Sequence, residues 1–288
     1  FMSTNNSTLD ANGGDGVGKC AAQGLVYSTM GSGTVLTKSG NILPLFDYDF
    51  LVNGNNSKHT VLGAVFDNAA FPFTKEIIDG VEYWSFDCAQ KSLALKYDAS
   101  EGKYFFQDMG VQDWAHNTLS DGYWNDAGGY GFFPFNAVLG GSANASQYNF
   151  GYGLKMDIKF YVPDSGKIDG HDIKLNFAGD DDLWVFIDGK LVLDVGGSHE
   201  SVSGSINFAT KTVWVSGVKA SQGGATPSGF TLSGDSTTEH TMTIFYMERG
   251  MWGSNLKLSF NFVDQTRLNV EKEVDASDVN SALFPETM

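Results

Sequence analysis

The sequence predicts an all-β protein, an antiparallel β-sandwich with a loop-rich N-terminal elaboration. Large apolar residues alternate with polar or smaller ones in three runs, at 154–160, 173–177 and 255–262. Such alternation buries one face of a strand and leaves the other in water. Three Asp-Gly pairs are flanked by strand-like residues, at 79–80, 169–170 and 188–189. Asp-Gly between two such runs is typical of a two-residue hairpin, and no long apolar pattern has helical spacing.

Taken in chain order, the remaining elements give the domain organisation. Residues 1–18 are polar and glycine-rich, so we expect a flexible N-terminus. Strands are expected at 81–86 and 103–106, separated by loops, and no linker divides this region from the rest of the chain. We therefore expect a single sandwich domain over 19–266 with its core at 130–263. The pattern changes after Asp264, and 267–288 looks like the first strand of a following domain.

Composition and charge exclude several classes of partner. The chain has 288 residues, 42% of them hydrophobic, and a formal net charge of −16. Nucleic acids and anionic membranes both select for Lys and Arg, so the acidic balance argues against either. No apolar run is long enough to insert into a membrane. The two cysteines, Cys20 and Cys88, fit no zinc motif; they form one disulfide or are both buried thiols.

The most informative stretch is an acidic run, Asp180-Asp181-Asp182, placed just before the strand–turn–strand pattern around Asp188-Gly189. Adjacent carboxylates repel each other unless water or a cation screens them. Calcium takes six to eight hard oxygen ligands from carboxylates, carbonyls and waters. The run therefore indicates a calcium site.

Several segments together resemble the fibro-slime domain, a member of the β-sandwich superfamily of the anthrax protective antigen and the flocculin lectins. The segments are 132–136, 148–152, 157–160, 177–199, 245–249 and 253–256. The resemblance implies a protective-antigen-like jelly-roll. The tail at 268–274 looks like the start of a collagen-adhesin B-type repeat, in which Lys272 would form an isopeptide bond or remain an ordinary surface lysine. The parent protein would then be a Gram-positive surface adhesin: a monomeric, extracellular, cell-wall-anchored tip domain.

The same resemblance implies a ligand set. In the flocculin-like lectins a cis peptide joins two aspartates that bind calcium, and Asp180 and Asp181 occupy their positions, leaving Asp182 as a bystander. A second loop would add the Glu248 side chain and the carbonyls of Gly250 and Trp252. Vicinal sugar hydroxyls would then bridge the calcium. The residues implied in contact with the sugar are Asp180, Asp181, Arg249, Met251 and Trp252.

These features predict a calcium-dependent carbohydrate-binding adhesin domain with a glycan partner. The alternative is a calcium-stabilised stalk or matrix domain that binds no glycan. His199 is either a ligand or base, or a buried residue bonded to a turn. We do not expect an enzyme, because no nucleophile elbow, zinc-protease or phosphate-loop motif is present and no carboxylate pair can be assigned to a cleft.

Overall fold

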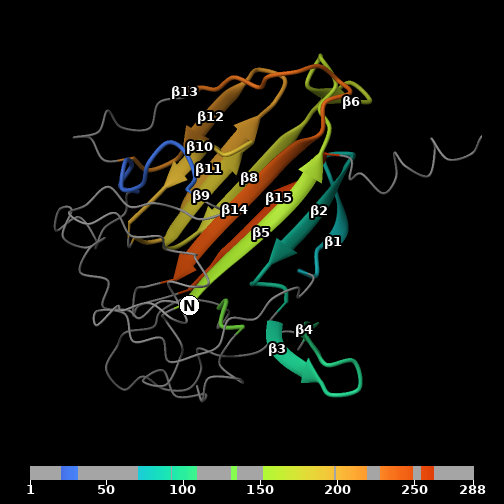
Figure 1. Cartoon of the computed structure of the whole chain (residues 1–288), viewed down its shortest axis with the longest axis vertical. Helices are drawn as coiled ribbons and strands as arrows, with labels where there is room; N and C mark the ends of the chain where they lie inside the picture. The colour runs from blue at the N-terminus through green and yellow to red at the C-terminus, as the bar shows by residue number, and fades with distance from the viewer. Residues whose placement is uncertain are drawn as a thin grey trace, which may run out of the picture.

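The computed structural model describes a large part of the chain, which is all-β (Figure 1). The described residues are 21–31, 71–91, 93–108, 131–134, 152–197, 199–218, 228–248 and 254–262. Within these ranges every assigned element is a strand, and none is a helix long and apolar enough to cross a membrane. The predicted fold class, an antiparallel β-sandwich, is confirmed.

Two antiparallel sheets form the body of the molecule. In spatial order, the larger sheet contains β1 (Thr74–Ile78), β2 (Val81–Asp87), β15 (Leu256–Phe260), β8 (Lys174–Gly179), β11 (Val202–Asn207), β12 (Thr212–Val215) and β13 (Ser228–Gly229). The smaller sheet contains β10 (Lys190–Val195), β9 (Asp182–Ile187), β14 (His240–Glu248) and β5 (Tyr152–Phe160). Two hairpins stand apart: β3 (Leu93–Asp98) with β4 (Lys103–Asp108), and β6 (Lys167–Ile168) with β7 (His171–Asp172).

The main core lies between the two sheets, and β9 shows how the sequence builds it. Alternate residues of this strand, Leu183, Val185 and Ile187, join the core formed with Phe177 of β8 and Leu258 of β15. All six residues of β9 are nevertheless buried. The strand must therefore be covered on its other face as well.

An N-terminal segment provides that cover. Trp184 and Phe186 of β9 pack in a second, smaller core with Leu25 and Val26. The indole Nε1 of Trp184 donates to Asp194 Oδ1 at 3.0 Å. The segment, blue in Figure 1, lies beside this sheet, and backbone bonds to β10 and its turn fix it there. The smaller sheet is consequently covered on both faces at β9.

The three predicted Asp-Gly hairpins are all present. Each connects two paired strands, and both turn residues have positive φ; the values are 51° and 81° at 79–80, 51° and 81° at 169–170, and 49° and 76° at 188–189. Two consecutive positive φ values define the type I′ turn, which matches the twist of the flanking strands. Because β2 of the first hairpin pairs with β15, residues 74–87 belong to the larger sheet of the sandwich.

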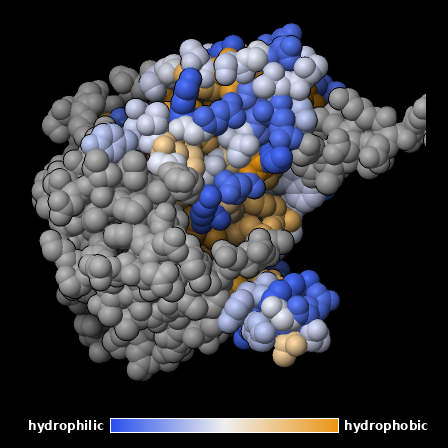
Figure 2. Space-filling model, in the orientation of Figure 1, coloured by the Kyte–Doolittle hydropathy of each residue, from blue (hydrophilic) through white to orange (hydrophobic). Residues whose placement is uncertain are grey.

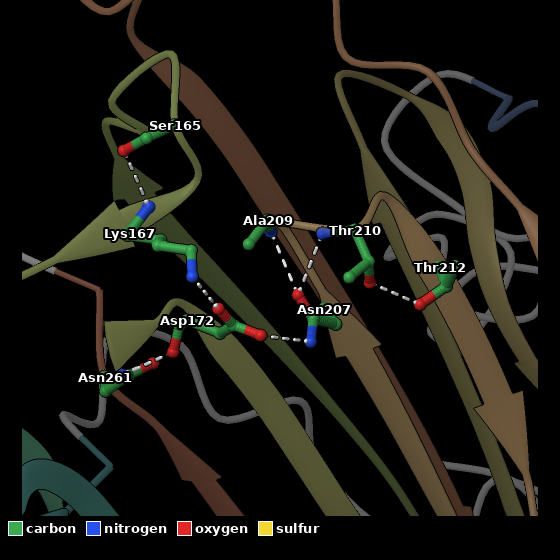
Figure 3. Close-up of polar contacts among 8 residues, drawn as sticks. All are labelled: Ser165, Lys167, Asp172, Asn207, Ala209, Thr210, Thr212 and Asn261. Atoms are coloured by element: carbon green, nitrogen blue, oxygen red, sulfur yellow. Dashed lines mark hydrogen bonds and ion pairs between the residues drawn. The ribbon is translucent and has the colours of Figure 1, made fainter. Parts of the chain in front are cut away.

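A polar network joins several strands at the N-terminal end of β8 (Figure 3). The Asp172 carboxylate pairs with Lys167 Nζ at 3.1 Å and accepts a hydrogen bond from Asn207 Nδ2 at 2.9 Å. The Asn261 side chain donates to the Asp172 carbonyl at 3.0 Å. These bonds tie the β6–β7 hairpin to the ends of β11 and β15. Donation by Asn207 and Lys167 lowers the pKa of Asp172.

The exposed face of β5 is hydrophilic. Figure 2 shows a hydrophilic band along this strand, where Lys155, Asp157 and Lys159 are exposed. Lys155 pairs with Asp157 at 3.3 Å, and Lys159 pairs with Glu239 at 2.8 Å. Exposed pairs of this kind contribute little stability, so the band mainly solvates the strand.

Several predictions fall outside the described residues. These are the flexible terminus at 1–18, the next-domain strand at 267–288 with Lys272, and the disulfide partner Cys20. Cys88 is buried at the end of β2, and its sulfur accepts a hydrogen bond from Leu256 N at 3.4 Å. The disulfide between Cys20 and Cys88 therefore stays a prediction.

Candidate functional site

The acidic run lies where the chain crosses from one sheet to the other. β8 ends at Gly179 in the larger sheet, and β9 begins at Asp182 in the smaller one. Asp180 and Asp181 form the link between them, joined by a cis peptide bond. Their exposures are only 7% and 3%. Two carboxylates are thus held in the interior at the same end of the sandwich.

Asp180 is fixed by Asn255, the residue just before β15. The backbone N–H and the side-chain amide of Asn255 both donate to the Asp180 carboxylate, the latter at 3.1 Å. Asp180 N in turn donates to the Asn255 carbonyl at 3.2 Å. The Asp180 carbonyl accepts a hydrogen bond from the Tyr246 hydroxyl at 2.7 Å. Both the backbone and the side chain of Asp180 are therefore held in place.

The other two aspartates bind the loop that comes after β10. Asp181 Oδ1 accepts from His199 N at 3.1 Å, and Asp182 Oδ1 accepts from Gly197 N at 2.5 Å. Asp182 is fully buried and bonded to Gly197, so it holds this loop in place and is not a residue without a role at the start of the strand. His199 is buried with Nδ1 2.8 Å from the Glu200 carbonyl, and its Nε2 has no hydrogen-bond partner among the described residues, so its role stays a prediction.

Glu248 is brought to the same place by strand pairing. It is the last residue of β14, and its neighbour Met247 pairs with Asp182. Its exposure is 0%. Burial, followed by the nearby charges of Asp181 and Asp180, raises the pKa of Glu248 well above its usual range, and a hydrogen bond with Asp181 raises it further. Without a cation, the site therefore favours a protonated Glu248.

Three buried hydroxyl groups, from Ser254, Tyr152 and Tyr246, form a hydrogen-bonded cluster next to the carboxylates. Ser254 Oγ donates to the Phe132 carbonyl at 2.7 Å and contacts the hydroxyls of Tyr152 at 2.9 Å and Tyr246 at 3.3 Å. The three aromatic rings, Phe132, Tyr152 and Tyr246, pack with centroids 5.7–6.1 Å apart. Burial, with the charges of Glu248 and Asp180 adding to it, raises the pKa of both tyrosines, so these groups act as neutral hydrogen-bonding partners.

The chemistry of this site suits a hard divalent cation. Three buried carboxylates share one end of the sandwich, and two of them raise the pKa of the third, which is the repulsion that a calcium ion relieves. In the part of the chain that the structure describes, however, no three His, Cys, Asp or Glu side chains are already spaced as a metal-ligand cluster. Backbone or water oxygens would have to complete the coordination.

Four predicted residues of the second loop lie outside the described residues, namely Arg249, Gly250, Met251 and Trp252. The structure does bring one flank of that loop, Glu248, beside the aspartates, and the other flank, Ser254, against Tyr246, whose hydroxyl bonds to the Asp180 carbonyl. Of the predicted side-chain ligands, it therefore gathers Asp180, Asp181 and Glu248 at one place. The roles of the loop residues remain predictions.

Sequence reasoning missed the residues that hold the carboxylates. Asn255, Tyr246 and Ser254 belong to expected strand or hairpin patterns, which assign them no role at the site. Tyr246 sits on an apolar stretch of β14, where a buried hydroxyl needs a polar partner. That requirement is the only signal the sequence offers, and it does not identify the partner.

Comparison with known proteins relates the chain to a group of eukaryotic proteins. Proteins psiB and psiG of Dictyostelium discoideum are 31% and 40% identical over 119 residues, 41% of this chain in each case. Protein psiO of the same organism is 41% identical over 63 residues, 22% of this chain. The chain spans only 16%, 14% and 8% of these three relatives. No family model and no solved structure matches the chain.

These findings correct one expectation. The prediction of a fibro-slime domain in a Gram-positive surface adhesin is wrong, because no family model supports it and the relatives found belong to a eukaryote. The sequence misled because the six segments behind the resemblance are short, and an acidic run before a β-hairpin does not by itself identify a family. The chain is thus an antiparallel β-sandwich similar, over parts of its length, to psi proteins of Dictyostelium discoideum.

Proposed function

We propose that this chain is a calcium-dependent carbohydrate-binding domain. The observation that carries the proposal is the gathering of Asp180, Asp181 and Glu248, all more than nine-tenths buried, at one end of the sandwich. Burying carboxylates costs free energy unless a cation or hydrogen bonds compensate it. A calcium ion provides such compensation with the oxygen ligands that it prefers.

The proposed ligands divide into two groups. The side chains of Asp180, Asp181 and Glu248 would hold the ion from one side, and the carbonyls of Gly250 and Trp252 would complete the set. When bound, calcium supplies coordination positions for vicinal sugar hydroxyls. Asp180 and Asp181 would accept hydrogen bonds from those hydroxyls, while Arg249, Met251 and Trp252 would contact the rest of the sugar.

The hydrogen bonds around the aspartates favour a second candidate function. Asn255 and the backbone N–H of His199 already bond to the Asp180 and Asp181 carboxylates. A calcium ion held there could stabilise the crossing between the sheets without meeting a sugar. This structural candidate predicts the same dependence of stability on calcium and no glycan binding.

We further propose that the domain acts outside the cell and catalyses no reaction. Extracellular modules bind calcium with Kd values of about 10⁻⁴–10⁻³ M. Such a site is filled only where free calcium reaches that range. The net charge of −16 also suits a neutral glycan better than a nucleic acid or an anionic membrane.

A glycan array probed in calcium and then in excess chelator tests the proposal. Calcium-dependent carbohydrate binding predicts binding that disappears in chelator and returns when calcium is restored. Asp181→Asn should abolish binding, whereas Asp172→Asn, at the opposite end of β8, should leave it intact. Binding that survives chelation would refute the calcium-dependent mode. Calcium-dependent melting without any glycan signal would favour the structural candidate.

A further inference from the structure

We propose that the edge of β1, with the cleft beside it, binds an extended basic peptide segment of another protein by adding it to the larger sheet as an extra strand. Among the described strands, β1 is the last of this sheet, and Figure 1 shows it at the outer margin next to β2. All five residues of β1 are exposed. This surface lies at the end of the sheet away from Asp180, so the proposal does not depend on calcium binding.

The backbone of β1 presents hydrogen-bonding groups outward. The turn at 79–80 closes the hairpin, so the flanking pair, Ile78 and Val81, exchanges both backbone bonds. Alternation along an antiparallel ladder then makes Lys75 and Ile77 the residues whose N–H and C=O groups point away from β2. These two residues would form the main-chain bonds with an added strand.

The same two residues direct their side chains to the cleft face. Ile77 lines a cleft of about 350 Å³ together with Trp84, Ile168 and Phe262, and Lys75 Nζ lies 5.1 Å from the centre of the Trp84 ring. Ile77 is 70% exposed, and Ile78 presents a second exposed isoleucine on the other face. An added strand alternates its side chains between these two faces. The cleft would take an apolar side chain that covers Ile77.

Local charge indicates the chemistry of the partner. Lys75 and Glu82 form an ion pair across the hairpin at 2.7 Å, and three further carboxylates surround the edge and cleft, from Glu76, Asp79 and Asp169. Since the whole chain carries −16, a second copy would meet both local and global repulsion. Lys or Arg residues flanking the apolar side chain would instead be attracted. The geometry therefore favours a basic partner segment over self-association.

Selection from a library of short random peptides displayed on phage tests the proposal, with the wild-type chain as target and Ile77→Pro for counter-selection. Proline removes the outward N–H of Ile77 together with its branched side chain, leaves the bonds between β1 and β2 intact, and is tolerated at such an edge. We expect enriched peptides to alternate apolar residues and to carry Lys or Arg. The best synthetic peptide should bind the wild-type chain about tenfold more tightly than Ile77→Pro.

Two controls separate the backbone from the side chain. Ile77→Thr retains the N–H and a β-branched side chain but loses apolar contact, so it should weaken binding less than Ile77→Pro. N-methylation of alternate peptide bonds in the peptide should abolish binding, and calcium chelation should not affect it. The proposal would be overturned if the peptide bound Ile77→Pro as tightly as the wild-type chain, or if the selected peptides were acidic rather than basic. A concentration-dependent dimer of the wild-type chain that Ile77→Pro dissociates would also overturn it.

Discussion

Replacing Tyr246 by Phe removes the hydroxyl that bonds to the backbone of the acidic site and also contacts Ser254. The hydroxyl of Tyr246 is fully buried and donates to the Asp180 carbonyl at 2.7 Å. Phe has the same ring, so the change deletes the donor without removing packing. A buried acceptor left unsatisfied costs about 1–3 kcal/mol. For a domain of this size that corresponds to a fall in Tm of about 2–12 °C.

The assay is thermal unfolding followed by calorimetry at a fixed, saturating calcium concentration. The matched control is Tyr97→Phe, because Tyr97 is 56% exposed on the β3–β4 hairpin. This control should stay within about 0.5 kcal/mol of the wild-type chain. If Tyr246→Phe unfolds at the same temperature as Tyr97→Phe, the Tyr246 hydroxyl does not stabilise the crossing between the sheets.

Three other substitutions test separate parts of the structure. The pKa of Glu248 is raised in the folded state, so in chelator the stability that its protonated form contributes is lost as the pH rises from the ordinary value of 4.5 through the raised pKa. Denaturant titrations at several pH values should show this loss in the wild-type chain and a flatter dependence in Glu248→Gln. The pKa of Asp172 is lowered instead, so the stability that it contributes is lost as the pH falls through that pKa. Asp172→Asn should remove this loss at acidic pH; an unchanged pH dependence would show that the bond from Asn207 does not form in solution. Trp184→Phe removes the donor to Asp194 and should cost about 1–3 kcal/mol in a urea titration; no change would show that this bond does not fix the N-terminal segment.

Local features of the fold could be predicted because they depend on residues that are close together in the sequence. Alternation predicted 154–160 and 255–262, which the structure forms as β5 and β15. The Asp-Gly pairs predicted hairpins because few sequences other than Asn-Gly and Asp-Gly so readily accept two positive φ values. The order of strands could not be predicted, because β15 lies between β2 and β8, which come from distant parts of the chain.

The candidate site was predictable only in part. The repulsion among Asp180, Asp181 and Asp182 is visible in the sequence, but their burial is not, and the structure buries all three. Asn255 could not be identified as the partner of Asp180, because that contact joins residues 75 positions apart. The burial of both faces of β9 was also missed, since it depends on an N-terminal segment whose sequence shows no strand pattern.

The central claim is that calcium binds at the crossing between the two sheets. Titration calorimetry of the chelator-treated chain with calcium measures this directly. We expect one ion per chain, with affinity reduced about 10-fold or more in Asp181→Asn and unchanged in Asp172→Asn, because removing a direct ligand should cost at least as much as removing its supporting partners. Absence of calcium binding, or equal binding by Asp181→Asn and the wild-type chain, would contradict the proposed site.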